Sequence, residues 1–138
     1  MFLLFHQARA EVSLRVQALR ELHRKFWFEN NIETRGLCLL RNWLTSEQRA
    51  QFDAKRYFDV IGCDSGKRYR IHYGAATNVH EIDTAGRPKV GWCFAPVGYL
   101  VAGDIMLAQK IALETNELGT LAVANRFAPK DAGLALPA

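Results

Sequence analysis

The segment from Lys67 to Tyr73 carries the most suggestive pattern of charged and aromatic side chains in the chain. Cationic and apolar residues alternate along it, and this two-residue period predicts a β-strand whose two faces differ. The cationic face would carry Arg68, Arg70 and His72. The apolar face would carry Tyr69, Ile71 and Tyr73. A row of cations on an open sheet face can hold phosphates, and exposed rings can stack on bases.

Neighbouring strands could extend this basic face. Asn78 and His80 share one face of the next predicted strand, and Lys89 begins a further strand. We therefore predict a surface that binds a protein partner or nucleic acid through Lys67, Arg68, Arg70, His72, His80 and Lys89. The alternative is that these charges keep the strand solvated and prevent the sheet from pairing with other sheets.

A second group of side chains has the chemistry of a zinc site. Cys63, His72, His80 and Cys93 are distributed one to a predicted strand or its end, and zinc accepts two Cys and two His ligands. However, 8, 7 and 12 residues separate them in turn, and no Cys-x-x-Cys pair is present. The sequence therefore predicts no metal site, although these four residues remain the candidates for one.

The usual sequence signatures of catalysis are missing. The chain contains no Gly-x-Ser-x-Gly elbow, no glycine-rich phosphate loop followed by Lys and Ser or Thr, and no His-Glu-x-x-His. These motifs mark common nucleophile, phosphate and zinc sites. We therefore predict no catalytic residue and no cofactor, and favour a non-enzymatic binding or accessory module. A small Cys/His enzyme or metalloprotein remains an alternative.

The hydrophobic periodicity predicts helices at both ends of the chain and strands between them. Helices are expected over residues 2–30 and 34–44. A short third helix is expected to follow a capping box formed by Thr45 and Gln48. Two further helices are expected to begin near residues 103 and 116. Strands are expected over residues 57–61, 68–73, 78–82 and 89–94. This order predicts an α+β fold in which a four-stranded antiparallel β-meander packs against N- and C-terminal helices. The expected divisions are a helical arm over 1–33, an α+β domain over 34–127 and a flexible tail over 128–138.

The predicted arm is amphipathic and could assemble the protein. Phe5, Val12, Leu19 and Phe26 recur every seven residues, which is the spacing of a coiled-coil seam. Arg15 and Glu29 interrupt the companion positions of that seam. A homo-oligomeric structural component, assembled through this helix, is therefore a further alternative.

Composition restricts the class of protein. The chain has 138 residues, 49% hydrophobic residues and a net charge of +4, which is ordinary for one globular domain. Its three cysteines are widely spaced, which does not resemble a secreted disulfide framework. No stretch approaches the ~20 apolar residues that span a bilayer. We therefore expect a cytoplasmic protein without a transmembrane segment.

Several short segments between residues 57 and 127 resemble a family of short bacterial proteins to which no activity is assigned. They are residues 57–62, 65–71, 78–79, 92–94 and 106–114. The resemblance implies that residues 34–127 form one unit with the first helix as an addition. It supplies no catalytic residue.

Overall fold

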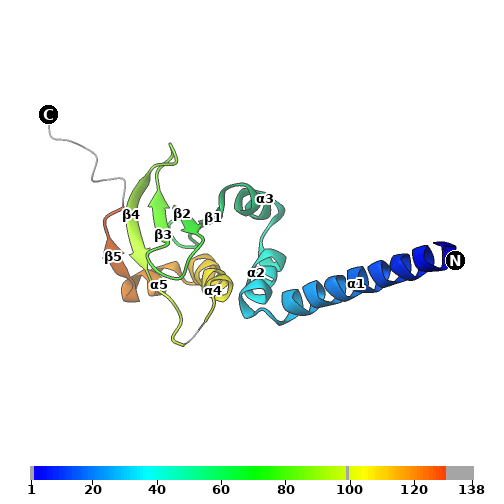
Figure 1. Cartoon of the computed structure of the whole chain (residues 1–138). Coiled ribbons are helices and arrows are strands. Elements are labelled where there is room, and N and C mark those ends of the chain that lie inside the picture. The colour runs from blue at the N-terminus through cyan, green and yellow to red at the C-terminus, as the bar shows by residue number, and fades with distance from the viewer. Residues whose placement is uncertain (1, 99, 130–138) are drawn as a thin grey trace. The chain divides into compact units, whose positions relative to one another are not determined.

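The computed structural model describes residues 2–98 and 100–129, without the side chains of residues 2–8 and 28–30. The chain divides into two compact units, Met1–Arg35 and Gly36–Ala138. The described residues form an α+β fold with five helices and a five-stranded antiparallel sheet (Figure 1). None of the described helices has the length and apolar character needed to cross a membrane.

Three helices precede the sheet in the chain. They are α1 (Phe2–Asn30), α2 (Ile32–Trp43) and α3 (Ser46–Lys55). The predicted capping box begins α3: the Gln48 N–H donates to Thr45 Oγ1 at 3.2 Å, and the Thr45 N–H donates to Gln48 Oε1 at 3.1 Å. Arg56 ends this helix in the left-handed conformation, with φ at 61°, and turns the chain into the first strand.

The strands follow one another in the sheet in chain order. They are β1 (Tyr57–Ile61), β2 (Arg68–His72), β3 (Val79–Ile82), β4 (Pro88–Cys93) and β5 (Asn125–Phe127). The first four confirm the predicted meander. The fifth corrects the sequence prediction, which counted four strands and expected a last helix from about residue 116. That helix ends at Val123. The three residues of β5 take their strand conformation from pairing with β4, and three residues are too few to show a periodic pattern in the sequence.

Helices α4 (Ala102–Thr115) and α5 (Glu117–Val123) complete the fold, and α4 packs against β1 and β2. Tyr69 and Ile71 are fully buried, so the apolar face of β2 is the one that meets the core, whereas Tyr73, predicted on the same face, is 38% exposed. The core cluster also includes Leu40, Phe52, Phe58, Val60, Val79, Met106 and Leu113. The sheet therefore has a core face and a second face, here called the outer sheet face, which carries Tyr57, Asp59, Arg68, Arg70, His72, His80 and Phe127.

Two glycines allow α2 and α4 to touch through their backbones. A Cβ on Gly103 would collide with the main chain of Gly36 and lie 2.6 Å from the Leu37 nitrogen. Both glycines are buried. This contact fixes the C-terminal part of α2 against the helix that covers the sheet.

Candidate functional site

One row of residues crosses the whole outer sheet face. Asp59, Arg70, His80, Gly91 and Phe127 are successive cross-strand partners on β1 to β5. Cross-strand partners in an antiparallel sheet project to the same side and lie about 5 Å apart. Residues from strands that are distant in sequence thus form one continuous surface.

Aromatic rings make a second continuous feature of this face. The ring centroids of Tyr57 and His72 are 5.2 Å apart, those of His72 and His80 5.2 Å, and those of His80 and Phe127 5.4 Å. We call these four side chains the aromatic row. All four residues are half-buried. Gly91 leaves room for the row, because a Cβ there would collide with the Phe127 ring.

Arg70 is held firmly within this surface. Its Nε and Nη2 atoms donate to Asp59 Oδ1 at 2.8 Å and Oδ2 at 3.1 Å, and its guanidinium lies 4.1 Å from the centre of the Tyr57 ring. Burial opposes ionisation of Asp59, but the hydrogen bonds and charge of Arg70 outweigh it and lower the pKa of that carboxyl. The positive charge of Arg70 is therefore balanced by Asp59, and the residue has a structural role.

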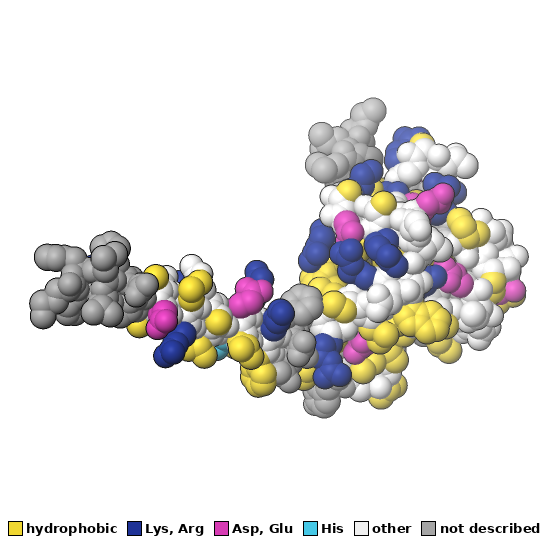
Figure 2. Space-filling view, turned by 90° about the vertical axis from the view of Figure 1, so that its right-hand side faces the viewer, with side chains coloured by type: hydrophobic (Ala, Val, Ile, Leu, Met, Phe, Trp, Pro, Cys, Tyr) yellow, Lys and Arg dark blue, Asp and Glu magenta, His cyan; other side chains and the backbone are white. Residues whose placement is uncertain are grey.

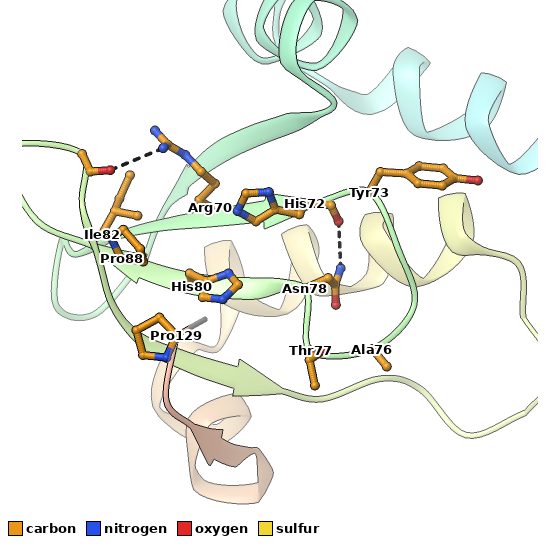
Figure 3. A pocket seen from close by; sticks show the side chains of 11 residues that line it. Arg70, His72, Tyr73, Ala76, Thr77, Asn78, His80, Ile82, Pro88 and Pro129 are labelled. Carbon is orange, nitrogen blue, oxygen red and sulfur yellow. Dashed lines mark hydrogen bonds between the residues drawn. The ribbon is translucent and has the colours of Figure 1, made fainter. Parts of the chain in front are cut away.

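A hollow of about 520 Å³ opens on the outer sheet face beside the two histidines (Figure 3). Arg70, His72, Asn78, His80, Ile82 and Pro129 are among the residues that line it. His72 and His80 lie side by side from β2 and β3, with Pro129 beside His80 (Figure 3). The hollow thus combines ring edges, imidazole nitrogens and apolar walls.

A buried amide pair fixes the wall of this hollow from beneath. Asn78 Nδ2 donates to Gln109 Oε1 at 2.8 Å, and Gln109 Nε2 donates to Asn78 Oδ1 at 3.0 Å and to the Phe94 carbonyl at 2.9 Å. Asn78 and Gln109 are 4% and 1% exposed. This pair connects β3 to α4 and holds the chain where it enters the strand.

The remaining predicted binding residues differ in their surroundings. Arg68 is exposed on the outer sheet face. Lys67 lies in the turn before β2, with its Nζ 3.5 Å from Glu81 Oε1. Lys89 is exposed where the register between β3 and β4 shifts.

Two cations that the sequence did not single out also approach rings of this region. The Nζ of Lys55 is 5.9 Å from the centre of the Tyr57 ring, and the Arg56 guanidinium is 4.7 Å from that of Tyr73. Both residues stand at the end of α3, just before β1. Sequence reasoning missed them, and missed the rings of Tyr57 and Phe127, because the faces of the sheet depend on pairing that no local pattern encodes.

The four zinc candidates are not assembled into one site among the described residues. The rings of His72 and His80 are adjacent, but His72 pairs with Tyr57 at the start of β1 and Cys63 lies beyond its end. The length of β1 separates these two side chains by roughly 15–20 Å. Cys93 lies opposite Asn125 in β4 and β5.

Cys63 belongs instead to a cluster with Asp64 and Glu117 at the start of α5. Glu117 is 1% exposed and accepts hydrogen bonds from the Ser65 hydroxyl, from the Tyr69 hydroxyl at 2.6 Å, and from backbone N–H groups of Asp64 and Ser65 at 2.9 and 2.8 Å. Asp64 Oδ2 accepts from the Leu118 N–H at 3.1 Å. These carboxylates are occupied in attaching α5 to the β1–β2 turn.

The hydrogen bonds to Glu117 shift the pKa values of the groups that they join. Burial alone would raise the pKa of Glu117, but the bonds from Ser65, Tyr69 and the turn backbone dominate and hold the pKa at about 2. Burial, and then the adjacent carboxylate, raise the pKa of Tyr69 above its usual value. The cluster is therefore ionised at Glu117, neutral at Tyr69, and structural.

Comparison with known proteins yields no relative: no family model, no curated protein and no solved structure matches the chain.

Proposed function

We propose that the outer sheet face binds single-stranded nucleic acid. The observation that carries the proposal is the aromatic row of Tyr57, His72, His80 and Phe127, which extends over the width of the sheet. Sheets that bind single strands stack successive bases on such rings, and stacking tolerates different sequences because every base has a π-face. The three centroid distances of 5.2, 5.2 and 5.4 Å limit the span of the row from the Tyr57 ring to the Phe127 ring to at most about 16 Å.

The charges around the row support the same ligand. Arg68 is exposed on this face, and Lys55 approaches its β1 side, with its Nζ 5.9 Å from the centre of the Tyr57 ring. Asp59 is paired with Arg70 and Asp83 with Arg87. Cations beside a stacking surface can hold the phosphates between stacked bases.

Fluorescence anisotropy with labelled single-stranded RNA and DNA twelve-mers tests the proposal. Binding is expected to weaken as salt rises, with a slope of log K against log salt of about −1.4 for two phosphate contacts, at Arg68 and Lys55. Tyr57→Leu removes one stacking ring and should weaken binding about 5- to 150-fold, corresponding to about 1–3 kcal/mol per stacked base.

The sheet itself offers a matched control for charge. Arg68 and Arg126 are both exposed, but Arg126 lies on the core-face side, 5.3 Å from the Trp92 ring centre. Arg68→Ala should weaken binding and reduce the salt slope by about 0.7, whereas Arg126→Ala should leave both unchanged.

Equal effects of the two arginine variants would show that binding depends only on net charge, and would refute a site on this face. Absence of binding at low salt would refute the nucleic-acid proposal. The search would then turn to a protein partner for the same surface.

We further propose that the protein works in a reducing compartment such as the cytoplasm. Cys38 and Cys63 are free and exposed thiols, which oxidising compartments convert to disulfides. Thiol labelling in intact cells should modify both.

A further inference from the structure

Helix α1 exposes a stripe of large apolar side chains. Val12 is 60% exposed, Leu19 68% and Phe26 65%. The stripe, called here the α1 stripe, consists of Val12, Val16, Leu19, Leu22, Phe26 and Trp27. At 100° per residue these six positions fall within an arc of about 140°. Figure 2 shows hydrophobic side chains along this helix, interspersed with charged ones.

The spacing within the stripe is that of a helix-to-helix seam. Val12, Val16 and Leu19 are separated by four and then three residues, and His23 and Phe26 continue the same alternation. A 4-3 repeat keeps apolar residues on a narrow line that another helix can fill. The combination of β-branched Val16 with Leu19 at the next seam position favours two strands over three or four.

The polar surface of the helix is predominantly basic. Between residues 9 and 27 it carries Arg9, Arg15, Arg20, Arg24 and Lys25 against Glu11 and Glu21, and Arg24 Nη2 lies 2.6 Å from Glu21 Oε1. Basic residues on the polar face also suit a helix that rests on anionic lipid. The choice of a protein occupant therefore rests on the 4-3 spacing of the seam, and binding of a monomeric chain to anionic lipid vesicles would overturn it.

We propose that the α1 stripe of a second copy of this chain occupies the seam, giving a two-stranded helical dimer. Identical seams are self-complementary, as a two-fold symmetric interface requires. Six side chains losing about 100 Å² each would bury roughly 1,200 Å² over two copies. That area exceeds the roughly 1,000 Å² that a specific interface needs.

Mass measurement by light scattering or sedimentation tests the dimer, on full-length protein at physiological salt and without nucleic acid. The expected mass is twice the 15.6 kDa of one chain, falling towards one chain on dilution. Because no nucleic acid is present, this result is independent of the proposed function of the sheet.

Two leucines on the same helix give a matched pair of variants. Leu14 is 64% exposed and Leu19 68%, but Leu14 lies about 140° away around the helix, outside the stripe. Leu19→Glu places like charges in the seam and should weaken dimerisation about a hundredfold, whereas Leu14→Glu should not change it. Circular dichroism should show equal helix content in the two variants.

A mass of one chain at every concentration would overturn the proposal. So would a larger assembly, or an equal effect of the two glutamate substitutions.

Discussion

Replacing Glu117 by Gln is expected to destabilise the fold strongly at neutral pH. The carboxylate accepts four hydrogen bonds from the β1–β2 turn and Tyr69. An amide presents an NH₂ group to donors that need an acceptor, so at least one buried donor loses its partner. The substitution keeps the volume of the side chain and changes only its charge and hydrogen bonding.

The magnitude follows from the pKa of Glu117, which the fold lowers from 4.5 to about 2. Each pKa unit corresponds to 1.36 kcal/mol, so the ionised form contributes about 3 kcal/mol to the free energy of unfolding. The folded pKa is below the unfolded one. This contribution is therefore complete above pH 4.5 and is lost as the pH falls towards 2.

Urea denaturation at pH 7 and pH 3 measures the effect. At pH 7 the variant should lose about 3 kcal/mol, which lowers the midpoint by roughly 1–3 M urea. At pH 3 the gap between the two proteins should narrow, because the wild type has already lost part of the contribution. Glu47→Gln, at an exposed glutamate, should change the free energy of unfolding by well under 1 kcal/mol at either pH. A gap that is the same at both pH values would refute the electrostatic explanation of the Glu117 contacts.

Two further substitutions test how the sheet is held to its helices. Gly103→Ala should lower the melting temperature by roughly 10 °C, since its Cβ would collide with the backbone of Gly36; calorimetry measures the change. Gln109→Leu should cost about 2–3 kcal/mol in urea denaturation, because the buried Asn78 amide and the Phe94 carbonyl lose partners. An unchanged midpoint would show that these groups find other partners.

Local signals in the sequence predicted most of the secondary structure. Strict alternation identified β2, and the Thr45–Gln48 pair identified the start of α3. Strand β5 escaped prediction because Asn125, Arg126 and Phe127 gain their conformation from pairing with β4. Such pairing is a tertiary contact over more than thirty residues, and no local propensity expresses it.

The site was less accessible to sequence reasoning than the fold. The sequence could place Arg68, Arg70 and His72 on one face of a strand, because the period of a strand is two. It could not show which residues of other strands lie beside them. The neighbours Tyr57 and Phe127 depend on register, and register depends on turns and core packing together.

The ion pair of Arg70 with Asp59 alters the conclusion drawn from the basic strand. From sequence, Arg68 and Arg70 are equivalent cations on one face. In the structure Arg70 holds Asp59 with two hydrogen bonds, and its guanidinium lies 4.1 Å from the centre of the Tyr57 ring. Removing it would leave a half-buried carboxylate without its cation and would repel any phosphate. An Arg70→Ala variant would therefore lose binding whether or not Arg70 touches the ligand, and Arg68 is the residue whose substitution is informative.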